Sequence, residues 1–112
     1  MSEPSIIQFL AERVQSIPTF KQQLLDIIEL SKKDAQASQA AANAITILVK
    51  AGIQFSEADL RGIRVPGSNL SGGVFDSAQL HGADLTNADM TKTWLRKANL
   101  SGTLMTGTKF GE

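Results

Sequence analysis

The residues that could carry out chemistry are few, and their spacing does not assemble an active site. The chain has a single histidine, His81, and no cysteine, which excludes a thiolate nucleophile, a disulfide and a thiolate metal site. Ser101 and Asp84 could join His81 in a triad only on an exposed surface, because no insertion forms a pocket around them. Neither a phosphate-binding glycine loop nor an HExxH motif occurs. The sequence therefore predicts a protein that is not an enzyme and that has no cofactor or metal site.

The elements that must position these residues repeat with a period of five. From Gly52 onward an apolar residue, which we call a centre, falls at every fifth position. The register does not slip across the whole series: Phe55, Leu60, Val65, Leu70, Phe75, Leu80, Leu85, Met90, Leu95, Leu100, Met105 and Phe110. This period matches neither an α-helix nor a flat strand, so the chain must turn a corner between repeats and wind into a coil with four short sides.

The residues around the centres support the same interpretation. Two positions before a centre the side chains are mostly small, which suits an inward wall, and two positions after it stand mostly Gly or Asn. Gly and Asn tolerate the positive φ that the third position of a type II turn requires. Asp59, Asp84 and Asp89 belong to the repeating pattern itself, so we expect solvated carboxylates at these positions rather than a metal site.

The repeats Ala58-Asp-Leu-Arg-Gly, Ala83-Asp-Leu-Thr-Asn and Ala98-Asn-Leu-Ser-Gly resemble the Ala-(Asp/Asn)-Leu-X-X motif of the pentapeptide-repeat family, over residues 53 to 112. The resemblance implies a solenoid, namely a right-handed quadrilateral β-helix with four pentapeptides per coil. About three coils would stack at roughly the 4.8 Å spacing of neighbouring strands. Residues twenty apart should then form inward columns, with Gly73 as a weak spot in the wall.

Residues 1 to 51 read as a helical leader. A first helix should end at Pro18, and a second should open at Thr19, whose spacing to Gln22 matches a capping box. A third helix should run to about Ala51, with Gly52 as its C-cap, and cover the open first coil. The expected fold class is α+β, with N-terminal α-helices capping a short β-helix in residues 52 to 112. Whether the first two helices pack on the coil or on a partner stays open.

The run from Ala41 to Gly52 leading into the repeats also resembles the segment that precedes the repeats in some multidomain proteins. Those proteins combine a NACHT-type nucleoside-triphosphatase, pentapeptide repeats and a WD-repeat propeller. This resemblance implies that the chain is an excerpt of a larger signalling protein or a stand-alone relative of one.

The net charge and the length of the apolar runs limit the classes of function that the chain could have. Lys+Arg and Asp+Glu number 11 each, so the formal net charge is zero, which argues against a nucleic-acid partner. No apolar run approaches the roughly 18 to 20 residues that span a bilayer, and the N-terminus lacks a basic secretory start. We expect a cytoplasmic protein that does not associate with a membrane. It should act as a non-catalytic protein-interaction, scaffold or spacer module. The alternative is a DNA-mimicking, topoisomerase-binding protein that protects or inhibits gyrase, as in some pentapeptide-repeat proteins, but that function requires a strongly acidic surface.

Two surfaces are candidates for binding partners. Trp94 lies one position before a centre, so it should point outward beside Val74, with Arg96 and Lys97 close by, and aromatic and Arg side chains are typical interface anchors. The second surface is the C-terminal end of the coil, built from Leu95, Leu100, Met105 and Phe110. An uncovered end would expose apolar side chains and backbone groups. We expect it to bind a second copy, giving an end-to-end homodimer, or to continue into a downstream domain.

Overall fold

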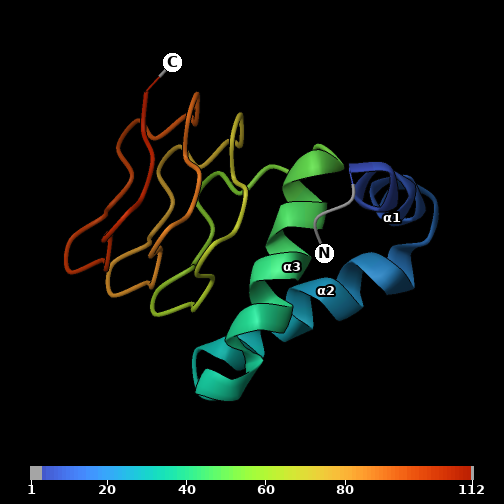
Figure 1. Ribbon diagram of the computed structural model, residues 1–112, viewed down its shortest axis with the longest axis horizontal. Coiled ribbons are helices and arrows are strands. Elements are labelled where there is room, and N and C mark those ends of the chain that lie inside the picture. The colour runs from blue at the N-terminus through green and yellow to red at the C-terminus, as the bar shows by residue number, and fades with distance from the viewer. Residues whose placement is uncertain (1–3, 112) are drawn as a thin grey trace.

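The computed structural model describes residues 4–111 (Figure 1). Three α-helices come first: α1 (Pro4–Ser16), α2 (Pro18–Ser31) and α3 (Ser38–Lys50), with the 3₁₀ helix η1 (Ala35–Ala37) before α3. Residues 53–111, which we call the repeat coil, wind beside α3 (Figure 1). We divide the repeat coil into a first coil (53–72), a second coil (73–92) and a third coil (93–111).

The start of α2 differs from the capping box expected at Thr19. The helix begins one residue earlier, with Pro18 in its first turn, and its N-cap Ile17 makes no side-chain cap hydrogen bond. Proline is favoured at the first helical position because its φ is already helical and the N–H that it lacks would have no partner there. Pro18 therefore both ends α1 and begins α2, and the capping-box prediction is wrong.

The end of α3 is closed as the sequence predicts. Gly52 has a φ of +86°, its N–H donates to the Val49 carbonyl, and the Ile53 N–H donates to the Leu48 carbonyl at 3.0 Å. This pair of bonds is the Schellman motif, which satisfies carbonyls that the last helical turn leaves without partners. Because the motif needs a left-handed residue, Gly52 turns the chain sharply from α3 into the first coil.

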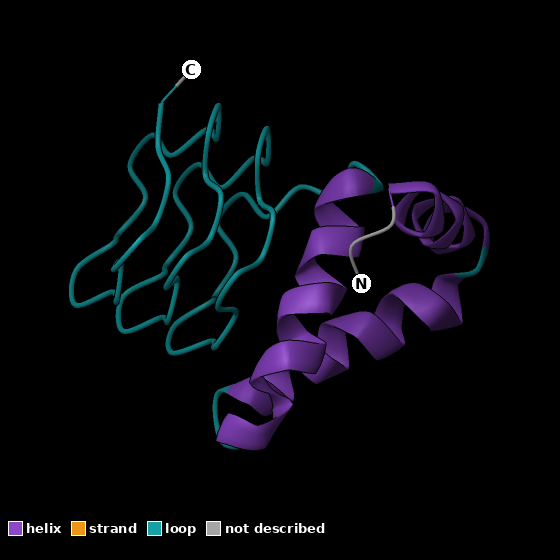
Figure 2. Ribbon diagram, in the orientation of Figure 1, coloured by secondary structure: helices purple, strands orange, loops and turns teal. Residues whose placement is uncertain are grey.

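The repeat coil corrects the expected fold class. Residues 53–111 contain no β-strand and no sheet (Figure 2), so the prediction of an α+β fold with a right-handed quadrilateral β-helix, a solenoid of stacked strands, is wrong. In place of strands the coil has turns every five residues and isolated parallel bridges such as Asp59–Gln79, Val74–Trp94 and Asp89–Lys109. The side between two turns is too short for consecutive ladder pairs, because a two-residue turn interrupts the chain in every pentapeptide and leaves a single bridge residue on a side.

The twenty-residue spacing of the inward columns is nevertheless confirmed. The N–H of each centre in the first two coils donates to the carbonyl of the residue nineteen positions later, as from Phe75 to Trp94 at 2.8 Å. The rings of Phe55 and Phe75 stack with their centroids 5.4 Å apart and an interplanar angle of 7°. Phe75, Leu80 and Leu85 are at most 1% exposed, so the centres of the second coil form the dry interior.

The corners all use left-handed backbone, including those without glycine. Glycine occupies most corners, but Glu57, Ser77, Asn87, Lys92 and Lys97 also have φ values between 59° and 62°. An L-residue in this region costs roughly 1 kcal/mol or more. Only Asn87 among the five was expected from its residue type. Three of the others, Glu57, Ser77 and Lys92, donate their N–H groups to carbonyls of the next coil, which holds them in this conformation.

Gly73 is not the weak spot that its missing side chain suggested. It is buried, and a Cβ built on it would lie 2.6 Å from the Cε2 atom of Phe75 and 2.9 Å from the Leu70 carbonyl oxygen. The Phe75 ring therefore fills the space that a wall side chain occupies in the other repeats. Glycine is required here because of this close approach.

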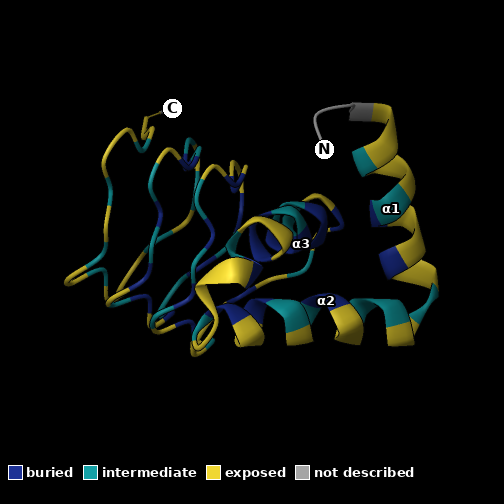
Figure 3. Ribbon diagram, turned by 60° about the horizontal axis from the view of Figure 1, so that its bottom comes forward, coloured by how far each residue is buried: buried dark blue, intermediate teal, exposed yellow. Residues whose placement is uncertain are grey.

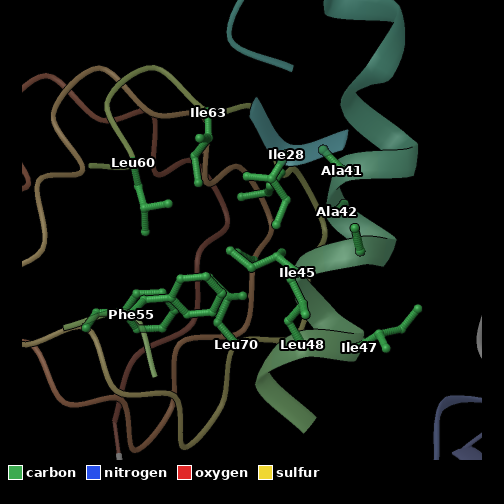
Figure 4. Packing of buried hydrophobic residues seen from close by; sticks show 14 of the residues in the cluster. Ile28, Ala41, Ala42, Ile45, Ile47, Leu48, Phe55, Leu60, Ile63 and Leu70 are labelled. Carbon is green, nitrogen blue, oxygen red and sulfur yellow. The ribbon is translucent and has the colours of Figure 1, made fainter. Parts of the chain in front are cut away.

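The helices cover the open side of the first coil. Ile45 and Leu48 of α3 are fully buried and belong to the same apolar cluster as Phe55 and Leu70 of the first coil, and Figure 4 shows them projecting from α3 toward Leu70. Figure 3 shows the exposed residues of α1 on the side turned away from the coil, and those of α2 on the side turned away from α3. One continuous core thus joins the leader to the coil.

Hydroxyl groups of the helices accept hydrogen bonds from the first coil, which has no preceding coil to supply carbonyl acceptors. In later coils the N–H before most centres donates to a carbonyl twenty-one residues earlier, as from Asp84 to Ile63. In the first coil the Arg64 N–H donates to the Ser31 hydroxyl of α2 at 3.0 Å, and the Asn69 N–H donates to the Thr46 hydroxyl of α3 at 3.0 Å. Both α2 and α3 therefore pack on the coil.

Candidate interaction surface

Trp94 lies where the sequence places it. It bridges to Val74 in the coil below, and its side chain is 55% exposed while Val74 is half-buried. The N–H of Trp94 donates to the Gly73 carbonyl and its carbonyl accepts from the Phe75 N–H. Because both backbone groups are held by the coil, the indole is presented from a rigid support.

Arg96 is the second member of this surface and contacts Trp94 directly. Its guanidinium carbon lies 5.8 Å from the centre of the indole ring, within the range of a cation–π contact. Asp76 holds Arg96 from below, because its carboxylate accepts the Arg96 N–H at 2.8 Å and lies 3.7 Å from the guanidinium. Sequence reasoning missed this role of Asp76. The twenty-residue spacing between Asp76 and Arg96 could have revealed it.

Two lysines flank Trp94 at the corners of the same side. Lys92 precedes it and Lys97 follows it, both exposed and both with positive φ. A hollow of about 760 Å³ opens beside them, lined by Lys92, Thr93, Trp94, Leu95 and Arg96. We call these five residues together with Lys97 the Trp94 edge.

The third coil is exposed at its far end. Leu95, Leu100 and Met105 are half-buried and Phe110 is 50% exposed, whereas the centres directly beneath them in the second coil are at most 1% exposed. Leu104 is 57% exposed and was missed, although it occupies an outward position held by Arg64 and Asp84 in the same column. Apolar side chains thus gather at this end.

The candidate triad is not assembled. The Ser101 hydroxyl donates to the Asn99 side chain at 2.7 Å, and Asp84 accepts from the backbone and hydroxyl of Thr86. Both groups are engaged in their own turns, so neither faces His81. Among the described residues no group of three or more His, Asp or Glu is placed to hold a metal ion.

The repeat carboxylates instead stabilise corners. Asp59 accepts two hydrogen bonds from the Arg61 guanidinium, each at 2.8 Å, and a third from the backbone N–H of Arg61. These bonds hold the pKa of Asp59 well below its ordinary value. Asp89 accepts from the backbone N–H and the hydroxyl of Thr91 at 3.0 and 2.8 Å, and these bonds lower its pKa as well. Hydrogen bonding to the charged form is the physical cause in both cases.

A second groove, of about 660 Å³, lies where α1, α3 and the first coil meet. Its lining combines α1 and α3 residues with two from the coil: Ser5, Ile7, Gln8, Thr46, Val49, Lys50, Asn69 and Ser71. Thr46 and Asn69 already bond to each other. Within residues 4–111 no helix has the length and apolar character needed to cross a membrane.

Comparison with known proteins agrees with the repeat pattern. The family model described as pentapeptide repeats matches eight copies, over residues 53–91 and 83–112, which together make up more than half of the chain. The search of curated proteins found no match. Pentapeptide repeats indicate a protein-interaction type of module, in a family that is generally non-catalytic. On the matched repeats and the twenty-residue hydrogen-bond pattern that they form, the chain belongs to the pentapeptide-repeat family.

Proposed function

We propose that this chain is a non-catalytic protein-interaction module that binds a protein partner through the Trp94 edge. The observation that carries the proposal is the exposure of Trp94, 55%, on a backbone that both neighbouring hydrogen bonds hold in place. An exposed, preorganised aromatic side chain beside an Arg supplies a large contact area at a small cost in conformational entropy. The helical leader covers the opposite end of the coil and leaves this edge open.

The charges support this function over DNA mimicry. The chain has no net charge, and Asp59 and Asp76 are each paired with an arginine of the coil. A surface that imitates duplex DNA would need a dense and uncompensated row of carboxylates.

Site-specific photo-crosslinking in cells that express the full chain tests the proposal. A benzophenone amino acid at Ser77, directly beneath Lys97, reports on the Trp94 edge. The same group at Asn87 is the matched control, because Asn87 is also a non-glycine corner with φ near 60° and lies two sides of the coil away.

We expect discrete protein adducts from position 77, absent from position 87, that disappear when Trp94→Ala is introduced. Calorimetry with the purified partner should show binding weakened at least about tenfold by Trp94→Ala, the loss typical of an interface anchor. Adducts that are equal at both positions, or that persist unchanged with Trp94→Ala, would overturn the proposal.

We also propose that the exposed end of the third coil binds a second copy of the chain. Half-buried Leu95, Leu100 and Met105, with Phe110 and Leu104 exposed, supply an apolar surface whose burial favours association. The ends of two copies can pair face to face in a closed dimer.

A further inference from the structure

One corner of the repeat coil differs from the other three. Each corner turns through a residue with positive φ, and the other three corners use glycine there in one coil or more: Gly62, Gly82, Gly102, Gly67, Gly107 and Gly72. At the corner that follows Trp94 in the chain, the same position holds Glu57, Ser77 and Lys97, with φ values of 62°, 61° and 62°. We call these three residues the corner column, because they stack along the side of the coil at twenty-residue spacing.

The backbone, rather than the side chains, holds the corner column together. The Glu57 N–H donates to the Asp76 carbonyl at 2.9 Å, and the Ser77 N–H donates to the Arg96 carbonyl at 2.7 Å. Glycine would donate the same bonds and would adopt positive φ without the steric strain that a Cβ atom causes. Strained backbone that the fold itself does not require is typical of functional sites. The side chains of the column therefore indicate a function.

The charge of the corner column changes sign along the coil. Glu57 lies in the first coil and Lys97 in the third, both exposed, and the uncharged Ser77 lies between them. Within residues 4–111 neither Glu57 nor Lys97 forms an ion pair. Two coil steps of about 4.8 Å separate the two backbones, so they lie roughly 10 Å apart. A complementary partner presents a cation and an anion at this separation.

Apolar side chains lie beside the same column. On the adjoining side of the coil Val74 is half-buried, Trp94 is 55% exposed, and the two residues bridge to each other. A partner that pairs with both charges would also cover these two side chains, which supplies the apolar burial that surface charges alone do not give.

The separation of the two charges fits an α-helix. Residues seven positions apart lie on one face of a helix, about 10.5 Å apart, because the rise is about 1.5 Å per residue. In an extended chain the side chains of one face lie about 6.7 or about 13.4 Å apart, and neither spacing matches. The helical residues between the two charges would lie opposite Ser77, whose small side chain leaves room for them, and beside Val74 and Trp94.

We propose that the corner column recognises an α-helix of the protein partner. The helix has a basic residue opposite Glu57, an acidic residue seven positions away opposite Lys97, and apolar residues between them over Val74 and Trp94. This proposal rests on the interaction function proposed above and names the part of the partner that the surface binds. Docking of an amphipathic helix through anchors on one face is a common mode of recognition.

The strain argument is tested by placing glycine at both ends of the column in the full chain. Glu57→Gly and Lys97→Gly should each raise the melting temperature by about 2 to 6 °C, because glycine relieves the strain. Asn87→Gly is the matched control, since Asn87 is a non-glycine corner with a φ of 59° in another column. A lower melting temperature in Glu57→Gly or Lys97→Gly would show that these side chains serve the fold, and would overturn the proposal.

Binding is measured by calorimetry and by the fluorescence of Trp94, the single tryptophan. The probe is an end-blocked, alanine-based helical peptide of about twenty residues, with Lys and Glu seven positions apart and Leu at two positions between them. The comparison peptides have Lys at both charged positions, Glu at both, or the original charges with a central Pro that breaks the helix.

We expect the Lys/Glu peptide to bind about three- to tenfold more tightly than each comparison peptide. Glu57→Lys should make the Glu/Glu peptide the tightest ligand, because the column then presents two cations. Glu57→Gly and Lys97→Gly should each weaken binding of the Lys/Glu peptide about threefold or more, whereas Asn87→Gly should leave it unchanged.

Equal affinity for the four peptides, or a ranking that Glu57→Lys does not alter, would show that the helix proposal is wrong. The crosslinking result separates this failure from a failure of the proposed function. Trp94-dependent adducts without discrimination among the peptides would leave the interaction function standing and reject only the helix as the bound segment. Loss of both would reject the two proposals together.

Discussion

The buried Ser31 hydroxyl accepts the Arg64 N–H at 3.0 Å, and the Arg64 guanidinium also donates to the Ser31 carbonyl at 2.7 Å. Ser31 is fully buried at the end of α2, and its hydroxyl also donates to the Ile28 carbonyl at 2.6 Å. Two residues thirty-three positions apart are thus joined by two hydrogen bonds between the leader and the first coil, both donated by Arg64. The pair ties the end of α2 to the first coil.

Ser31→Ala should destabilise the chain by about 1 to 3 kcal/mol, because it leaves the Arg64 N–H without a partner in a part-buried setting. Chemical denaturation followed by circular dichroism measures the free energy of unfolding. Ser101→Ala is the control, since its hydroxyl bonds only to the exposed Asn99 side chain, and it should cost less than about 0.5 kcal/mol. Equal losses in the two variants would contradict the role given to Ser31.

Gly73→Ala should also destabilise, by about 1 to 3 kcal/mol, because the added methyl group would overlap the Phe75 ring. Phe75→Leu removes the ring and introduces the side chain that half of the repeats have at this position. A double-mutant cycle from urea denaturation should show that Gly73→Ala costs clearly less in the Phe75→Leu background. If the cost is the same in both backgrounds, the Phe75 ring is not what requires glycine.

Acid should weaken the corner that Asp89 stabilises. The pKa of Asp89 is lowered by the hydrogen bonds from Thr91, so its contribution to stability is fully present above the ordinary carboxyl pKa of about 4 and is lost as the pH falls through the lowered pKa. Asp89→Asn keeps an acceptor oxygen but cannot titrate. The melting temperature of the Asn variant should therefore fall less than that of the parent between about pH 6 and about pH 3.

Thr91→Val provides the second arm of this experiment, because it removes the hydroxyl donor and keeps the backbone one. Its acid sensitivity should lie between those of the parent and Asp89→Asn. Identical pH profiles for all three proteins would show that the Thr91 bonds do not couple Asp89 to stability.

Self-association through the third coil should be lost in Phe110→Glu, because a carboxylate at the exposed end opposes burial against a second copy. Sedimentation velocity across a range of concentrations measures it. Phe9→Glu is the matched control, since Phe9 is exposed to a similar degree, 57% against 50%, but lies on α1. A parent that stays monomeric at high concentration, or a loss of association in both variants, would contradict the proposal.

The sequence by itself determined which residues of the repeat coil point inward and where the chain turns. A period of five needs no knowledge of distant residues, so the stack of Phe55 on Phe75 and the outward position of Trp94 could be read directly. The role of Gly52 as the cap of α3 could also be predicted from the sequence. A left-handed residue at the end of a helix depends only on a few neighbouring residues.

The tertiary structure decided what depends on contacts between distant residues. The short sides form single bridges instead of strands, because a turn interrupts the chain in every repeat and leaves no consecutive pairs. Lys92 and Lys97 adopt positive φ against their own preference, because the stacked coil overrides it. Gly73 was misjudged for the same reason: the pattern shows an absent side chain, but only the packed structure shows the Phe75 ring that takes its place.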